Sequence, residues 1–261
     1  MELSLENNLF ISYACHITSH NDLNLIKNNL EIVSKKCKII GITYSIKSNI
    51  LDKDIIKDIL TSFQKDIINM EVYGEIKNEG YDFKKHVHTI KKFQEKTLNN
   101  DYILMMNDSV IPTSDISFNN AMSKLLISMN EGYEFIGFLA SKELMRHYQS
   151  WFWCCDKNVI EWLLYQIDNI ICPENKDDIV LKLEVGLSNI LIRNKKSKAL
   201  YDFDVQRNLF YYHPDVYINA LDNGFPFLKK NYFSKEFINA NDLTVYKEIV
   251  DYLPKNISEF I

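Results

Sequence analysis

The segment that decides the fold is Tyr102–Ser109, which reads YILMMNDS. Its first five residues form an uninterrupted apolar run that ends abruptly in three polar residues. A continuous apolar run of this kind is typical of a strand buried on both faces, as in the centre of a parallel sheet. We therefore expect a central strand over 102–106 whose carboxyl end presents Asn107, Asp108 and Ser109.

Strand and helix patterns alternate on the amino-terminal side of this segment. Short stretches rich in β-forming residues predict strands at 9–15, 37–44 and 67–72. Apolar residues at helical spacing predict helices at 23–33, 52–63 and 83–98. Asn21 or Asp22 is placed to cap the first of these helices. The alternation indicates an α/β fold with a central, mostly parallel sheet flanked by helices.

The pattern is less regular after residue 115. A buried strand is expected at 133–140, and helices are expected at 119–129, 158–171, 184–192 and 243–252. No internal repeat and no Ser/Gly-rich linker divides the chain. We therefore expect one domain over 1–261.

The composition excludes several classes of protein. The chain has 261 residues, of which 46% are hydrophobic and 13% aromatic, and this is enough for a packed core. The formal net charge of -5 excludes a global basic field for binding nucleic acid. The sequence contains no apolar run of about 18 residues, so no integral membrane segment is expected.

The cysteines and the first residues predict a cytoplasmic protein. The five cysteines are odd in number, and their spacing fits neither a zinc site nor a disulfide framework. We expect reduced, mostly buried thiols at Cys15, Cys37, Cys154, Cys155 and Cys172. The segment 1–6 carries acids where a signal peptide needs basic residues.

Three places along the chain are candidates for ligand binding. In open α/β sheets, ligands bind outside the carboxyl ends of the strands. That rule selects the turn 12–20, the loop 78–82 and the strand end 107–109, which should meet at one rim of a parallel sheet. The sequence has no dinucleotide-binding glycine motif, Walker loop, nucleophile elbow or zincin motif, so the corresponding enzyme classes lose their main support.

Two acids at these places have two interpretations each. Asp108 follows a wholly apolar strand, where it either meets a metal ion or sugar hydroxyl or caps the turn that leads to Pro112. Asp82 either caps the helix that starts beside it or accepts a hydrogen bond from a ribose or sugar hydroxyl. Gly80 can adopt a backbone geometry that is closed to other residues.

The second half of the chain adds further candidates. His147–Trp153 combines hydrogen-bonding side chains with aromatic rings, which suits sugar rings stacked on aromatic faces while Gln149 and Ser150 bind their hydroxyls. The alternative is a strand whose aromatic residues belong to the core. Glu184 lies amid apolar residues, where it is either a general base or an acid on the exposed side of a helix start.

Taken together, these elements resemble the rhamnan synthesis F family of glycosyltransferases. The resemblance rests on blocks that follow the family's order: 78–83 (NEGYDF), 106–110 (MNDSV), 135–138 (FIGF), 147–152 (HYQSWF), 184–188 (EVGLS) and 224–229 (GFPFLK). It implies a GT-A-like, Rossmann-like single domain. In that domain, residues 1–115 would bind a nucleotide sugar and residues 116–261 would bind a glycan acceptor.

The resemblance also implies roles for the candidate residues. In such enzymes an acidic strand end meets the donor diphosphate, usually through Mn²⁺ or Mg²⁺, and Asp108 takes that place as metal ligand and catalytic residue. The block differs from the usual Asp-x-Asp because only Asp108 is acidic. Glu184 is the expected catalytic base of an inverting transfer. The substrates would be bound by Asn78, Gly80, Asp82, Asn107, Ser109, His147, Gln149 and Ser150.

These assignments predict an enzyme that moves a sugar such as rhamnose from a nucleotide-diphosphate donor to a glycan acceptor. The alternative is a catalytically inactive glycan- or nucleotide-binding module on the same scaffold, which the single acid of 107–109 keeps open. Slow hydrolysis of the donor in the absence of an acceptor distinguishes the two. The sequence leaves the oligomeric state open.

Overall fold

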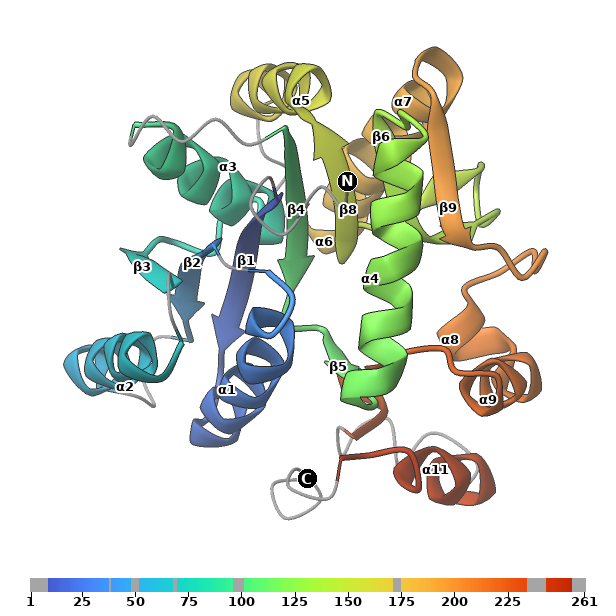
Figure 1. Ribbon diagram of the computed structural model, residues 1–261, viewed down its shortest axis with the longest axis horizontal. Coiled ribbons are helices and arrows are strands. Elements are labelled where there is room, and N and C mark those ends of the chain that lie inside the picture. The colour runs from blue at the N-terminus through green and yellow to red at the C-terminus, as the bar shows by residue number, and fades with distance from the viewer. Residues whose placement is uncertain are drawn as a thin grey trace.

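The computed structural model describes residues 9–37, 39–47, 52–67, 70–95, 101–170, 175–233 and 243–254 (Figure 1). Some predictions concern residues outside these ranges. They are the acidic segment 1–6, Cys172, parts of the strands expected at 37–44 and 67–72, and the ends of the helices expected at 83–98 and 158–171.

A mostly parallel sheet forms the centre of the described structure. Its strands lie in the order β3 (Met70–Glu75), β2 (Ile39–Ile46), β1 (Leu9–Ile17), β4 (Tyr102–Asn107), β8 (Phe152–Asp156), β6 (Phe135–Ser141) and β7 (His147–Tyr148), and β9 (Ser197–Tyr201) pairs with β6. Neighbours among β1, β2, β3 and β4 are parallel, and so are β6 and β9. β8 is antiparallel to β4 and β6, and β7 is antiparallel to β6.

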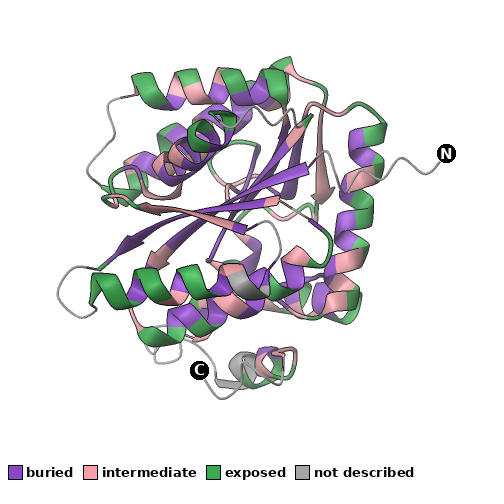
Figure 2. Cartoon of the chain, turned by 60° about the vertical axis from the view of Figure 1, so that its left-hand side comes forward, coloured by how far each residue is buried: buried purple, intermediate pink, exposed green. Residues whose placement is uncertain are grey.

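Helices cover both faces of this sheet, which confirms the expected α/β class. The apolar side chains of α1 (His20–Ser34), α2 (Lys53–Asp66) and α4 (Asp115–Asn130) belong to one core cluster. Those of α3 (Tyr81–Gln94), α5 (Lys157–Asn169) and α7 (Ser188–Asn194) belong to the other. The buried sides of the helices face the strands, and the exposed sides face away (Figure 2). This is the layered arrangement of a Rossmann-like fold.

Shorter elements complete the described chain. They are α6 (Lys176–Ile179), the π-helix η2 (Val180–Leu187), α8 (Leu209–Tyr212), α9 (Pro214–Asp222), the 3₁₀-helix η3 (Lys230–Phe233) and α11 (Leu243–Val250). A two-stranded ribbon lies outside the main sheet, where β5 (Val110–Pro112) pairs antiparallel with β10 (Phe227–Lys229).

β4 takes the central place expected for the apolar run that precedes Asn107. It lies between β1 and β8, and its residues from 103 onward are buried. The chain moves from β1 to β2 and β3 on one side, and then returns to place β4 on the other side of β1. The strand order therefore reverses between β1 and β4, which is where doubly wound sheets bind their ligands.

The start of α1 differs from the sequence-based expectation. Ser19, rather than Asn21 or Asp22, is the N-cap residue. Its backbone is extended, with φ of -153°, so its hydroxyl accepts a hydrogen bond from the Asp22 N–H while the Asp22 carboxylate accepts from the Ser19 N–H. Asp22 thus belongs to a capping box and turns its carboxylate toward the end of β1.

Two later segments also differ from expectation. The aromatic stretch 147–155 splits into β7 and β8, because Gln149–Trp151 bends the chain between two reversed strands. The helix expected at 184–192 begins earlier, and Glu184 lies inside η2 rather than at a helix start. π-helical turns of this kind occur frequently at functional sites.

The buried thiols agree with the prediction from the sequence. Cys15, Cys37, Cys154 and Cys155 are buried and form no disulfide. Among the helices that the structure describes, none combines the length and the apolar character needed to span a membrane.

Candidate functional site

A cleft of about 700 Å³ opens at the carboxyl ends of β1 and β4. Its wall includes the turn after β1, the loop before α3, the loop after β4, the bend between β7 and β8, η2 and the start of η3. The carboxylates of Asp82, Asp108 and Glu184 all line it. The volume lies within the range of small-molecule binding sites in proteins.

A hydrogen-bonded chain of side chains joins two of the predicted loops. Asn107 Nδ2 donates to Asp82 Oδ2 at 2.7 Å, and the Ser109 N–H donates to Asn107 Oδ1 at 3.0 Å. Lys85, whose side chain is fully buried, donates to Asn78 Oδ1 at 2.8 Å and lies 3.5 Å from Asp82 Oδ1. The loops 78–82 and 107–109 therefore hold each other's polar side chains in place.

In the loop before α3, Gly80 forms the turn and Asp82 lines the cleft. Gly80 is the N-cap residue of α3, with a left-handed φ of 69°, and it does not line the cleft. Tyr81 follows with φ of 51°, a strained value for a residue with a side chain, and it does line the cleft. Asp82 lies in the first turn of α3, and no side chain caps that helix. Strained residues of this kind gather at functional sites.

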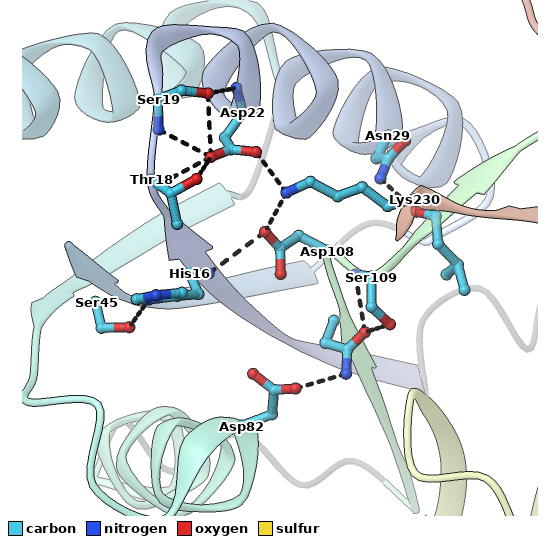
Figure 3. Close-up of polar contacts among 12 residues, drawn as sticks. His16, Thr18, Ser19, Asp22, Asn29, Ser45, Asp82, Asp108, Ser109 and Lys230 are labelled. Carbon is cyan, nitrogen blue, oxygen red and sulfur yellow. Dashed lines mark hydrogen bonds and ion pairs between the residues drawn. The ribbon is translucent and has the colours of Figure 1, made fainter. Parts of the chain in front are cut away.

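Asp108 is paired with a lysine from the far end of the chain. Lys230 Nζ lies 3.2 Å from Asp108 Oδ2 and 2.6 Å from Asp22 Oδ1, between the two carboxylates (Figure 3). The other Asp22 oxygen accepts the N–H and the hydroxyl of Thr18, at 2.7 and 2.8 Å, and the Ser19 N–H at 2.9 Å. The His16 N–H donates to Asp108 Oδ2 at 3.4 Å. The carboxylates in the first turn of α1 and directly after β4 thus share one ammonium group.

Burial and charge act in opposite directions on these groups. Burial is the largest effect on Asp108, and it raises the pKa of this carboxyl despite the neighbouring Lys230. For Asp22, burial alone would raise the pKa, but Lys230 and the hydrogen bonds from Thr18 outweigh it and lower the pKa overall. For Lys230, burial acts downward, but the two aspartates raise its pKa above the ordinary lysine value. Lys230 is therefore a permanent cation of the site.

A second lysine lines the cleft beside the first. Lys229 Nζ donates to Ser109 Oγ at 3.0 Å and lies 5.9 Å from the ring centre of Trp151 and 5.6 Å from that of Phe210. Burial lowers the pKa of Lys229 to about 8, against the opposing effects of Glu184 and Asp82. Lys229 thus carries its charge at neutral pH in a desolvated place.

Glu184 is fixed from two sides. The backbone N–H of Ser150 donates to Glu184 Oε2 at 2.7 Å, and the Ser150 hydroxyl donates to the same oxygen. His147 Nε2 lies 3.8 Å from the other oxygen, Oε1. Because His147 Nδ1 is 2.9 Å from the Met145 carbonyl, which only accepts, the proton of a neutral His147 lies on Nδ1 and its Nε2 is unprotonated. His147 therefore lies beside Glu184 without a hydrogen bond to it and does not line the cleft.

The cleft wall also contains a buried amide. Gln149 Oε1 accepts a hydrogen bond from Trp151 Nε1 at 2.7 Å. Gln149 Nε2 is buried, and the described residues offer it no hydrogen-bond partner. Since buried polar groups in proteins are nearly always paired, this donor suits an acceptor such as a ligand hydroxyl.

The residues around Asp108 fit an ammonium group better than a divalent cation. Mg²⁺ takes about six oxygen ligands at about 2.0–2.1 Å. Within the part of the chain that the structure describes, no three side chains of His, Cys, Asp or Glu are grouped to hold a metal ion. The place between the nearest two carboxylates belongs to Lys230 Nζ. The chemistry of these donors therefore disagrees with the expected Mn²⁺ or Mg²⁺ site at Asp108.

The cleft brings together most of the side chains predicted from the sequence. Those that line it are Asn78, Asp82, Asn107, Asp108, Ser109, Gln149, Ser150 and Glu184. Gly80 and His147 lie outside its wall. Sequence reasoning missed the charged partners Asp22 and Lys230. The available signals were an acid one turn into the helix after the first strand, and a lysine doublet directly after the apolar run 225–228.

Comparisons with known proteins add no family assignment. A scan against protein-family models finds no match for this chain, and a search of the curated proteins finds no similar sequence. The resemblance to the rhamnan synthesis F family stays a prediction from the blocks quoted above, and the function is argued from the geometry of the cleft.

Proposed function

We propose that the chain is a GT-A-like glycosyltransferase, related to the rhamnan synthesis F family, that moves a sugar from a nucleotide diphosphate to a glycan acceptor with inversion. One observation carries this proposal. Asp82, Asp108 and Glu184 come from distant parts of the sequence and line one cleft at the point where the strand order reverses. Nucleotides bind at that point in doubly wound folds.

The donor half of the cleft is supported by side chains suited to hydroxyl groups. The amide groups of Asn78 and Asn107 and the carboxylate of Asp82 are held by their neighbours in fixed orientations. Such preorganised groups bind ribose or sugar hydroxyls without paying for side-chain ordering. The unpartnered Nε2 of Gln149 offers one more donor to a sugar.

The general base of the proposed reaction is Glu184. Inversion requires a carboxylate that takes the proton of the acceptor hydroxyl as it attacks the sugar. Ser150 engages Oε2, so Oε1 is the oxygen left to accept that proton. His147 Nε2 lies 3.8 Å from this oxygen.

Donor binding is tested first. Thermal unfolding is followed with a panel of nucleoside diphosphates that differ in their nucleobase. One of them should raise the Tm of the protein. A ligand present at 100 times its Kd adds about 2.7 kcal/mol, which corresponds to a rise in Tm of roughly 5 to 11 °C for a chain of this size. A panel in which no nucleotide changes Tm would refute a nucleotide-sugar site.

Turnover is tested next, with the matching nucleotide sugar and no acceptor. Slow release of the nucleoside diphosphate is expected, because water takes the place of the acceptor hydroxyl. The ion pair of Asp108 with Lys230 also suits a binding module that performs no chemistry. Nucleotide binding with no release over a prolonged incubation, and no transfer to any glycan, would favour that second function.

A further inference from the structure

The lysine doublet reaches the cleft because of a specific strand pairing. β10 runs antiparallel to β5, so Lys229 lies opposite Val110. The Lys230 N–H donates to the Ser109 carbonyl at 2.9 Å, and the Thr113 N–H donates to the Pro226 carbonyl at 2.8 Å. Backbone hydrogen bonds therefore fasten the doublet to the loop that carries Asp108.

The two lysines differ in how much of their binding capacity is used. Lys230 is engaged by both Asp22 and Asp108. Lys229 Nζ donates to the Ser109 hydroxyl, and this is the one hydrogen bond of its ammonium group among the described residues. An ammonium group has three N–H donors, so Lys229 keeps donors for a ligand. It lines the cleft half-buried, with its Nζ over the Trp151 and Phe210 rings.

We propose that Lys229 and Lys230 together form the positively charged site that binds a diphosphate in the cleft. They take the role of the divalent metal that the resemblance implies. Lys229 contacts the phosphate oxygens. Lys230 holds the position between Asp22 and Asp108 and keeps these carboxylates from repelling the anion. The identification of the diphosphate as part of a sugar donor rests on the proposed function, whereas the anion site itself does not.

The physical basis is the charge that develops on the departing group. When the bond to the sugar breaks, negative charge grows on the diphosphate, and fixed positive charges in a water-poor cleft stabilise it strongly. Lysine binds phosphate as a compact point charge. Because β10 is hydrogen-bonded to β5, the ammonium groups need little reorganisation as the charge appears.

The test uses inorganic pyrophosphate, measured by calorimetry in EDTA and again with Mn²⁺. The wild-type protein should bind pyrophosphate in EDTA. Lys229→Met should weaken this binding about 10- to 100-fold, the loss typical of one charge-assisted contact. Lys57→Met is the control, since Lys57 is an exposed residue of α2 away from the cleft.

Lys230 is tested by asking whether its removal creates a metal site. Lys230→Met leaves Asp22 and Asp108 facing each other, so Mn²⁺ alone should raise the Tm of this variant and leave that of the wild-type protein unchanged. Lys230→Arg keeps the charge and should still bind pyrophosphate in EDTA, which preserves the test if Lys230→Met does not fold.

Two results would overturn the inference. One is binding of pyrophosphate by the wild-type protein that requires Mn²⁺, and the other is binding in EDTA that Lys229→Met leaves unchanged. These outcomes are separate from the fate of the proposed function. Metal-dependent sugar transfer would refute the inference about the lysines and leave the proposed function standing. Pyrophosphate binding without any hydrolysis or transfer would refute the proposed function and leave the anion site standing.

Discussion

Replacing Glu184 by glutamine isolates the chemical role of its carboxylate. Glutamine has the same shape, and its carbonyl oxygen can accept the two hydrogen bonds that Ser150 now donates to Oε2. Its NH₂ group then takes the place of Oε1, 3.8 Å from His147 Nε2. We therefore expect the variant to fold with a loss of about 1 kcal/mol or less, the usual net worth of one hydrogen bond.

The effect on catalysis should be much larger. Removing a general base typically costs about 100- to 10,000-fold in rate, which is about 2.7 to 5.4 kcal/mol in the activation barrier. Donor affinity should hardly change, because Glu184 is placed to meet the acceptor hydroxyl. The variant should thus show a normal thermal shift with the nucleoside diphosphate and an almost complete loss of transfer.

The assay follows release of the nucleoside diphosphate with and without acceptor, in parallel for the wild-type protein, Glu184→Gln and Glu161→Gln. Glu161 is an exposed residue of α5, and its variant controls for the change of charge. Turnover by Glu184→Gln within a few-fold of the wild-type value would refute the assignment of Glu184 as base. An equal loss in both variants would point to a nonspecific charge effect.

Three further predictions concern core packing, the loop 107–109 and the pH dependence of stability. Gly137→Ala places a methyl group 2.3 Å from Cβ and Cγ of Tyr148 on the neighbouring strand, so it should lower the free energy of unfolding in urea by about 1–3 kcal/mol, and an unchanged value would contradict the packing. Asn107→Asp puts a second carboxylate where Asn107 now donates to Asp82 at 2.7 Å; donor affinity, read by calorimetry, should fall roughly tenfold or more, and Mn²⁺ should not restore it. The pKa of Lys229 is lowered to about 8 by burial, so above pH 8 the unfolded state holds the proton that the folded state releases. The free energy of unfolding of the wild-type protein should therefore rise from pH 8 to about 10.5 relative to that of Lys229→Met, and a pH-independent difference would refute the shift.

The regular part of the fold follows from the sequence because its strands are long and apolar. The run that ends at Asn107 predicts a central strand, and β4 occupies that place between β1 and β8. The alternation of strands and helices up to residue 107 predicts the parallel arrangement of β1 to β4. The reversed strand β8 is not predictable in this way, because the apolar pattern of a buried strand carries no information on its direction.

The candidate site could be predicted as far as it depends on strand ends. The rule for carboxyl ends of strands selects the loops 78–82 and 107–109, and these loops are hydrogen-bonded to each other. The sequence wrongly predicts that His147 shares the cleft wall with Gln149 and Ser150, whereas His147 lies outside that wall, beside Glu184. Residues two positions apart share one face of a continuous strand, but β7 ends at Tyr148 and the chain bends there, so His147 and Gln149 part.

The lysine doublet could not be predicted to meet Asp108. β5 and β10 have three residues each, too few to show the two-residue period of a strand. The contact between Lys230 and Asp108 spans 122 positions of sequence. Only the pairing of these short strands brings the two residues together.

The pairing of β10 with β5 determines how much of the chain must be synthesised before the cleft has its two lysines. Every strand of the described central sheet is synthesised before residue 227. Asp22 and Asp108 therefore precede their lysine partner in synthesis. Their counter-charge, Lys230, follows directly after β10, so the two carboxylates have no ammonium group between them until β10 pairs with β5. Premature termination upstream of residue 227 would remove the lysine between Asp22 and Asp108 together with the core side chains of Phe227 and Leu228, so loss of charge balance and loss of packing would come together.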